Sequence, residues 1–320
     1  MVRIPAFILL FFFALTAAEG ASFPYNGRIC VPVADVRTEP SDPPAERNHD
    51  PLEETQLLYG DPVRVLEERG DWLRVLCPEQ QEFTHHQRWE GYPGWIRKTA
   101  VVSDQNNWFP KITITAKQAD ARLKPSDKEP VFIRFSIGTH LTGTKENGWW
   151  KLRLLDGTQT WIHENQALPQ QRIEEIQSSQ ELLYPRIVET ARLFLGDPYY
   201  WGGRSGYDPQ QPSPPHTGVD CSGLIGLIYQ ANNLLLPRDA HEQWMNCDKT
   251  SRSLLRLGDL VFLFDPKNSK KVTHVMLYSG NNRVIEAPNT GKTVREIDLD
   301  ERLREEPDRQ VDYGTYLNWE

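Results

Sequence analysis

The chain has 320 residues, and its 44 acidic and 36 basic side chains give a formal charge of −8 at pH 7. This negative charge disfavours nucleic acid or an anionic membrane as the main partner, because both repel acidic surfaces. The length suits about two domains, or more if the units are small. The 10 tryptophans and 24 prolines are typical of a β-rich, turn-rich protein.

The first twenty residues are predicted to be a secretory signal peptide. Arg3 precedes an apolar run over 4–15, and small residues follow at Ala18, Gly20 and Ala21, where cleavage is expected. The alternative is a membrane anchor, but the run is shorter than the roughly 20 residues that a spanning helix needs. We therefore expect an exported protein, periplasmic or secreted, with no membrane span after cleavage.

An internal repeat indicates two similar modules before residue 170. Segment 34–41 (Ala-Asp-Val-Arg-Thr-Glu-Pro-Ser) recurs as 119–126 (Ala-Asp-Ala-Arg-Leu-Lys-Pro-Ser). Short β-type runs separated by turn residues favour a small all-β barrel for each copy, and both copies look like bacterial SH3-type domains. We predict these SH3-like domains over 21–103 and 104–170, with two unrelated β modules as the alternative.

The first copy is the longer one. Two insertions, near 42–54 and 78–90, are rich in Pro, Gln, Glu and His. This composition predicts loops at both places.

The remaining segment, 171–320, has the pattern of an α+β domain. Apolar residues recur at helical spacing through 172–195, and Pro185 is expected to divide this stretch into two helices. A proline-rich loop follows at 205–218. The elements expected after it are a helix over 222–232 and strands over 259–264, 274–279 and 283–287.

The run Asp220-Cys221-Ser222-Gly223 is the strongest indication of chemistry. Asp220 is a good N-cap, so Cys221 is expected to begin a helix, where free N–H groups and the helix dipole favour a thiolate. About fifty residues later His274 is expected to open an apolar strand after a polar loop. A thiol and an imidazole are the nucleophile and base of covalent catalysis. The alternative is a buried structural cysteine with a structural histidine.

A third residue is expected to orient the imidazole. Glu286 lies between Ile285 and Ala287 in the next apolar strand, where burial of a carboxylate is costly unless it is paired. Accepting the second ring N–H of His274 would pair it. The alternative is a glutamate on an edge strand that faces water.

The four cysteines are Cys30, Cys77, Cys221 and Cys247. No two of them have the spacing of metal ligands, so we expect no zinc site and no other cofactor. In an exported protein Cys30 and Cys77 are either a disulfide or two free thiols.

Three segments resemble motifs of the NlpC/P60 cysteine peptidases, both in their residues and in their order along the chain: 220–223, 258–262 and 274–278. With two SH3-type modules ahead of them, the whole chain is similar to the γ-D-glutamyl-L-diamino acid endopeptidases of that family. The resemblance implies a papain-like α+β catalytic domain over 171–320. It also implies a monomer that acts on peptidoglycan-derived peptides in murein recycling or turnover.

The resemblance assigns catalytic roles to four residues. Cys221 matches the nucleophile and His274 the base, and Tyr199 matches a tyrosine whose hydroxyl helps to hold the oxyanion. The third catalytic position, twelve residues after the base, is usually histidine and is Glu286 here. A carboxylate can orient the base, so activity is expected, with an altered pH optimum.

The resemblance also assigns substrate contacts. Asp220 and Ser222 match positions that contact the free amino terminus of the substrate, and Asp239 and Ala240 match a loop that lines the cleft. Tyr92 matches a tyrosine that the first module inserts into the cleft.

A glutamate of that first module is expected there too, either Glu53 or Glu54, and we choose Glu53. Carboxylates at this place would hold the ammonium of an unblocked L-alanine, so released stem peptides are favoured over the intact wall. Two alternatives remain: a catalytically impaired wall-binding protein, which Glu286 favours, and a related thiol amidase or acyltransferase.

Overall fold

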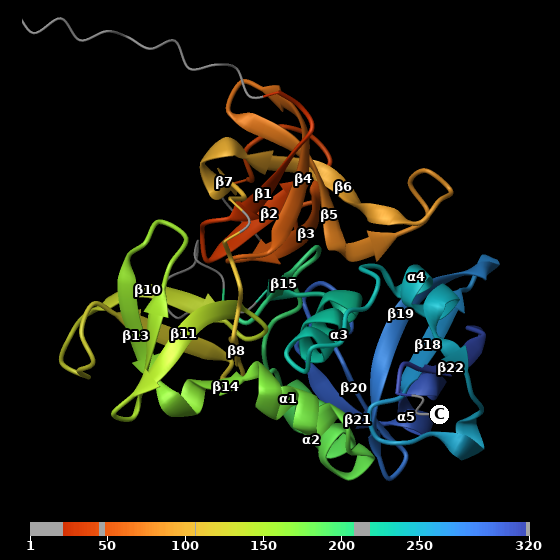
Figure 1. Cartoon of the computed structure of the whole chain (residues 1–320). Coiled ribbons are helices and arrows are strands. Elements are labelled where there is room, and N and C mark those ends of the chain that lie inside the picture. Colours follow the sequence, from red (N-terminus) through yellow and green to blue (C-terminus); the bar gives the residue numbers. More distant parts are fainter. Residues whose placement is uncertain (1–21, 45–48, 106, 208–217, 318–320) are drawn as a thin grey trace, which may run out of the picture.

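The computed structural model describes residues 22–44, 49–105, 107–207 and 218–317. The predicted signal peptide and residues 208–217 of the predicted proline-rich loop lie outside the described residues. Two seven-stranded sheets occupy the first half of the chain, and helices packed on a six-stranded sheet occupy the second (Figure 1). Among the described residues no helix is long and apolar enough to cross a membrane.

The two N-terminal sheets have the same topology. The strand orders are β3-β2-β6-β5-β4-β1-β7 and β10-β9-β13-β12-β11-β8-β14, which become identical when seven is subtracted from each label of the second. The repeated Ala-Asp-x-Arg segment begins on β2 in the first sheet and on β9 in the second. This equivalence argues against two unrelated β modules.

The strands of the first sheet are β1 (Tyr25–Ile29), β2 (Val33–Arg37), β3 (Glu53–Leu58), β4 (Pro62–Arg69), β5 (Trp72–Glu82), β6 (Glu90–Arg97) and β7 (Val101–Ser103). Those of the second are β8 (Ile112–Ile114), β9 (Gln118–Arg122), β10 (Val131–Ser136), β11 (His140–Glu146), β12 (Trp149–Arg153), β13 (Gln159–His163) and β14 (Ala167–Pro169). Alternate residues point inward, as Val63 and Val65 do in β4, so each sheet encloses its own apolar core.

The predicted loop at 78–90 is wrong, because much of it is a β-hairpin arm. β5 continues to Glu82 and pairs with β6 again at Glu90, after a bulge beyond Cys77. The polar composition is misleading here because polar side chains of this segment form buried hydrogen bonds. Gln80, for example, donates to the Gln56 carbonyl oxygen at 2.8 Å. We call the segment 78–90 the hairpin arm. It extends toward α4 (Ala240–Asn246) in Figure 1.

The helices of the second half are α1 (Gln170–Gln177), α2 (Gln180–Arg192), α3 (Cys221–Gln230), α4 and α5 (Leu299–Glu305), with short 3₁₀ turns at Lys98–Ala100, Glu164–Gln166 and Arg252–Leu254 elsewhere. The strands are β15 (Arg204–Ser205), β16 (Gly218–Val219), β17 (Asp248–Lys249), β18 (Leu260–Asp265), β19 (Asn268–Gly280), β20 (Arg283–Glu286), β21 (Arg295–Asp298) and β22 (Val311–Thr315). Six of these strands form one antiparallel sheet in the order β17-β22-β18-β19-β20-β21. This sheet and the helices together give the mixed helix and strand content that was expected.

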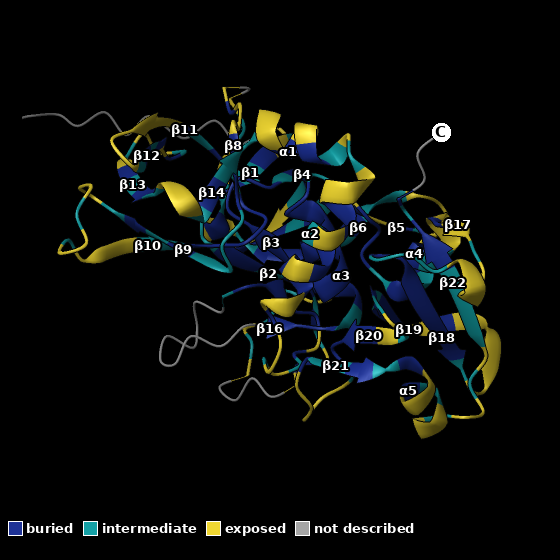
Figure 2. Ribbon diagram, turned by 90° about the horizontal axis from the view of Figure 1, so that it is seen from below, coloured by how far each residue is buried: buried dark blue, intermediate teal, exposed yellow. Residues whose placement is uncertain are grey.

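The central helix α3 is apolar on every side, which is typical of a helix enclosed by protein. Leu224, Ile225, Leu227 and Ile228 have no exposed surface, and the helix belongs to the same core as Val275 of β19. Figure 2 shows α3 in the dark blue of buried residues, whereas α5 has an exposed outer face. This packing places the N-terminus of α3 beside β19.

Two local expectations are wrong. The break between α1 and α2 falls at Ser178 and Ser179, and Pro185 lies inside α2, where its missing N–H removes only one hydrogen bond near the start of the helix. His274 does not open a strand, because β19 begins six residues earlier at Asn268. The polar residues before His274 form the solvent-facing part of the β18–β19 hairpin.

Candidate active site

The cysteine at the start of α3 is held by a tight N-terminal cap. Asp220 is the N-cap, as predicted, and its Oδ1 accepts from the Gly223 N–H at 2.7 Å. Cys221 is the first helical residue and is half-buried. A Cβ on Gly223 would lie 2.1 Å from the Gly203 carbonyl oxygen, so only glycine allows this close approach.

His274 connects the thiol to the carboxylate that was predicted from the sequence. Its Nε2 lies 2.6 Å from Oε2 of Glu286, and the ring is also hydrogen-bonded to Cys221. Burial alone would lower the pKa of His274, but the hydrogen bonds to Cys221 and Glu286 outweigh burial and raise the pKa to about 9. With this pKa the His274 imidazole stays protonated at neutral pH, next to the Cys221 sulfur.

Tyr199 lies in the same pocket as the thiol. Burial, followed by the nearby Cys221 and Asp220, raises the pKa of the Tyr199 phenol. The hydroxyl therefore stays protonated and can donate a hydrogen bond to charge that develops next to the sulfur.

A cavity of about 530 Å³ opens over Cys221 and is lined by residues from both halves of the chain. The hairpin arm contributes Thr84 and His85, and α4 contributes its first residue, Ala240, which was expected at the cleft. Thr84 N–H donates to Glu242 of α4 at 3.1 Å, which fixes the arm against the second half of the chain. Among the described residues His85 also lines a neighbouring cavity of about 720 Å³ over the first sheet.

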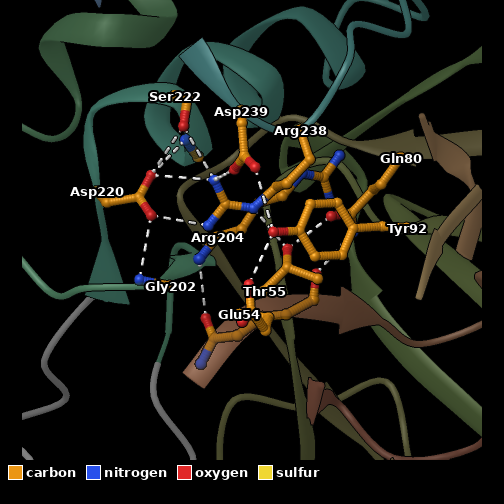
Figure 3. Close-up of polar contacts among 12 residues, drawn as sticks. Glu54, Thr55, Gln80, Tyr92, Gly202, Arg204, Asp220, Ser222, Arg238 and Asp239 are labelled. Carbon is orange, nitrogen blue, oxygen red and sulfur yellow. Dashed lines mark hydrogen bonds and ion pairs between the residues drawn. The ribbon is translucent and has the colours of Figure 1, made fainter. Parts of the chain in front are cut away.

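One end of the 530 Å³ cavity is acidic. The Tyr92 hydroxyl lies 2.8 Å from Oε2 of Glu54 and 3.2 Å from Oδ2 of Asp239 (Figure 3). Withdrawal of Asp239 from water, helped by the neighbouring carboxylates Glu242, Asp220 and Glu54, outweighs Arg238 and raises the pKa of Asp239 to about 7. The Asp239 carboxyl is therefore partly protonated near neutral pH and can lose its proton when a cation binds beside it.

The choice of Glu53 as the pocket glutamate is wrong. Glu53 has no exposed surface, and its Oε2 lies 3.2 Å from Nη1 of Arg37 inside the first module. Neighbouring side chains of a strand point to opposite faces, so Glu54 lines the cavity instead.

Asp220 and Ser222 line the cavity, but their polar groups are already bonded to protein. Arg238, nearly fully buried, donates to both oxygens of Asp220 at 3.2 and 2.7 Å and to Ser222 Oγ at 3.0 Å (Figure 3). The Gly202 N–H also donates to Asp220 at 3.1 Å. The charge of Asp220 is therefore already compensated inside the protein.

Arg238 is the main residue that the sequence interpretation missed. Its Nε donates to Thr55 Oγ1 of β3 at 2.6 Å, and its N–H donates to the Gln81 carbonyl of the hairpin arm at 2.9 Å. It thereby joins the first module to the loop before α4. The only indication in the sequence was its place beside Asp239 in a segment already assigned to the cleft.

Two other features bear on cofactors and redox state. Ligand atoms of Glu82, His86 and Glu90 lie within 4.8 Å of one another on the hairpin arm, a spacing that could hold a metal ion. Arg88 already contacts Glu90 at 2.7 Å, so an ordinary ion-pair cluster accounts for the group. Cys30 and Cys77 are free thiols, which agrees with the second of the two alternatives.

The chain is similar to several known proteins. Residues 196–311 match the NlpC/P60 family. The γ-D-glutamyl-L-lysine dipeptidyl-peptidase of Bacillus subtilis strain 168 is 29% identical over 252 residues, which are 79% of this chain and 78% of that protein. A protein of the same name from Bacillus cereus is also 29% identical, over 77% of this chain and 70% of its own length.

The fold comparison agrees. The crystal structure of an NlpC/P60 family protein from Bacillus cereus matches with a TM-score of 0.75 and 25% identity, covering 92% of this chain and 100% of that chain. Residues 196–311, which include Cys221, His274 and Glu286, are therefore similar to the NlpC/P60 family, and most of the chain is similar to the two Bacillus peptidases.

Proposed function

We propose that this protein is a cysteine endopeptidase that hydrolyses the γ-D-glutamyl–diamino acid bond of peptidoglycan stem peptides whose L-alanine has a free amino group. The observation that carries the proposal is one cavity lined by Cys221 and, at an acidic end, by Glu54 and Asp239. His274 contacts Cys221 from outside this lining, and Glu286 lies behind His274. The names of the two Bacillus relatives support the same bond.

The reaction proceeds through an acyl-enzyme. The Cys221 thiolate attacks the γ-carbonyl carbon, and the oxyanion accepts hydrogen bonds from Tyr199 and the first N–H groups of α3. The His274 imidazolium gives its proton to the departing amine of the diamino acid. His274 then takes a proton from water, which attacks the thioester and frees the thiol.

The acidic end of the cavity selects the substrate terminus. A free alanine ammonium at this end forms charge-assisted hydrogen bonds with Glu54 and Asp239, and Tyr92 lies between them. In an intact wall strand this nitrogen is an amide, which has no charge and leaves the carboxylates unpaired. Released peptides, as in recycling or turnover, are therefore the preferred substrates.

The same contacts predict a pH-dependent KM. Asp239, with its pKa raised to about 7, is mostly protonated at pH 6 and ionised at pH 8, and only the ionised form attracts an ammonium. KM for the free-amine peptide is expected to fall about fivefold from pH 6 to pH 8, because the ionised fraction of Asp239 rises about tenfold while about half of the peptide α-amino groups lose their proton by pH 8. Steady-state kinetics of wild type and Asp239→Asn check this, because the variant should lose the trend. An unchanged trend in Asp239→Asn would contradict the assignment.

We further propose the domain boundaries and processing of the chain. A signal peptide over 1–20 directs export, and two SH3-type barrels over 21–103 and 104–170 precede a papain-like catalytic domain over 171–320. The identical strand orders of the two sheets support the pair of barrels, and the placement of Cys221 at the start of α3 beside His274 on β19 supports the catalytic domain.

Product analysis by mass spectrometry tests the proposed function. L-Ala-γ-D-Glu-L-Lys, the corresponding meso-diaminopimelate peptide and intact sacculi are each incubated with the purified protein. The expected products of both peptides are L-Ala-γ-D-Glu and the free diamino acid. Release of alanine alone, or cleavage of sacculi as readily as of the free peptides, would overturn the proposal.

A further inference from the structure

Glu286, behind His274, accepts hydrogen bonds from two arginines. Nε and Nη2 of Arg295 lie 2.9 and 2.7 Å from Oε1, and Nε of Arg302 lies 2.8 Å from Oε2, the same oxygen that contacts His274. Glu286 has no exposed surface and Arg302 has 4%. One buried carboxylate therefore faces two guanidinium groups and the imidazole.

Each arginine comes from a separate element and is fixed at its far end. Arg295 lies directly opposite Glu286 in the β20–β21 register and also binds Glu305. Arg302 projects from α5 and donates through Nη2 to Glu306 at 2.7 Å. The positions of both groups are thus set by the fold and not by Glu286 alone.

We propose that Arg302 and Arg295 are positioning residues that keep Glu286 ionised and limit the base strength of His274. This inference rests on the proposed role of His274 as the catalytic base. Glutamate can occupy a position that is usually histidine because the two arginines, which do not lose their protons, compensate its buried charge.

The shared oxygen explains how Arg302 acts on the base. The guanidinium draws negative charge on Oε2 toward itself, so the carboxylate stabilises the imidazolium less than an unpaired carboxylate would. Burial alone would raise the pKa of Glu286, but its hydrogen bond to His274 and the charges of His274 and Arg302 bring the pKa to about 2. Glu286 therefore accepts from His274 at every working pH.

Removal of Arg302 is expected to raise the pKa of His274. In Arg302→Met, Glu286 keeps Arg295 and stays ionised, but Oε2 faces His274 without competition. The imidazolium proton should then be lost about one pH unit higher than in wild type. Arg302→Lys keeps the positive charge and should stay close to wild type. Arg304→Met, an exposed position on the same helix, is the matched control and should change nothing.

The rate of Cys221 alkylation by iodoacetamide, followed against pH, measures this directly. In the plot of rate against pH, the step at higher pH, called the upper step, reports loss of the His274 proton from the thiolate–imidazolium pair. The Cys221→Ala variant gives the background rate of the other three thiols. The assay needs no substrate, so failure of the proposed peptidase activity would show separately, as absent peptide cleavage.

The outcomes are distinct. An upward shift in Arg302→Met, with Arg302→Lys and Arg304→Met unchanged, supports the proposal. An upper step at the wild-type pH together with a lower melting temperature would assign Arg302 only to the anchoring of α5 and overturn it. If Arg302→Met does not fold, Arg295→Met, at a half-buried position, should shift the step in the same direction, and an unshifted step there would also overturn the proposal.

Discussion

Replacement of Cys221 by alanine is expected to lower kcat/KM on L-Ala-γ-D-Glu-L-Lys by about 10⁴-fold or more, because the proposed acyl intermediate forms on the Cys221 sulfur. Cys221 begins α3 and is hydrogen-bonded to His274, so its loss removes the nucleophile and leaves the base without its proton donor. The acidic end of the cavity does not involve the thiol. Peptide affinity, measured by calorimetry, should therefore change little.

Cys30 provides the matched control for this variant. It is a partly exposed free thiol of the first module, and its Sγ lies 3.4 Å from the Thr99 carbonyl oxygen. Cys30→Ala is expected to keep wild-type activity. Retention of activity in Cys221→Ala, or its loss in Cys30→Ala, would place the chemistry elsewhere.

The second large effect is expected at Arg238. Arg238→Met removes a guanidinium with 2% exposure that neutralises Asp220 and also bonds Ser222 and Thr55. An uncompensated carboxylate at the cap of α3 should lower the free energy of unfolding by about 3–5 kcal/mol. It should also raise KM, since the contact between the first module and the loop before α4 is lost. Urea unfolding and steady-state kinetics measure the two effects.

Arg88 is the control for the loss of an arginine. Its side chain is 71% exposed and pairs with Glu90 at the surface of the hairpin arm. Arg88→Met should cost less than about 1 kcal/mol, because exposed ion pairs contribute little. Equal and small costs for the two variants would show that Arg238 does not support the site.

The contacts of Cys221, His274 and Glu286 could be predicted because each residue has a local indication in the sequence. Asp220 before Cys221 predicts the helix cap, and an acidic residue inside an apolar strand predicts a partner for Glu286. Both contacts are present in the structure. The strand that carries His274 was predicted too, but its start was not, because the polar residues of a hairpin outside the core resemble a loop.

The acidic end of the cavity was harder to predict than the contacts of Cys221, for physical reasons. Glu53 and Glu54 are neighbours, and a register change of one residue reverses which of them faces the cavity. Arg238 meets Thr55 across 183 residues of sequence, so its burial depends on how the first module docks. Nothing local separates it from an exposed loop arginine. Arg302 on Glu286 was missed for the same reason, since α5 returns to the strand only in the folded chain. Arg295 was missed because β21, which places it opposite Glu286, was not predicted.

The central claim is that one cavity joins a cysteine nucleophile to a site for a free amino terminus. Its most direct test compares kcat/KM for L-Ala-γ-D-Glu-L-Lys with kcat/KM for the same peptide acetylated on alanine. We expect a preference for the free amine on the order of a hundredfold or more, because two charge-assisted hydrogen bonds are lost on acetylation. The preference should collapse in Glu54→Gln/Asp239→Asn. Equal kcat/KM for the two peptides in the wild-type protein would contradict the account.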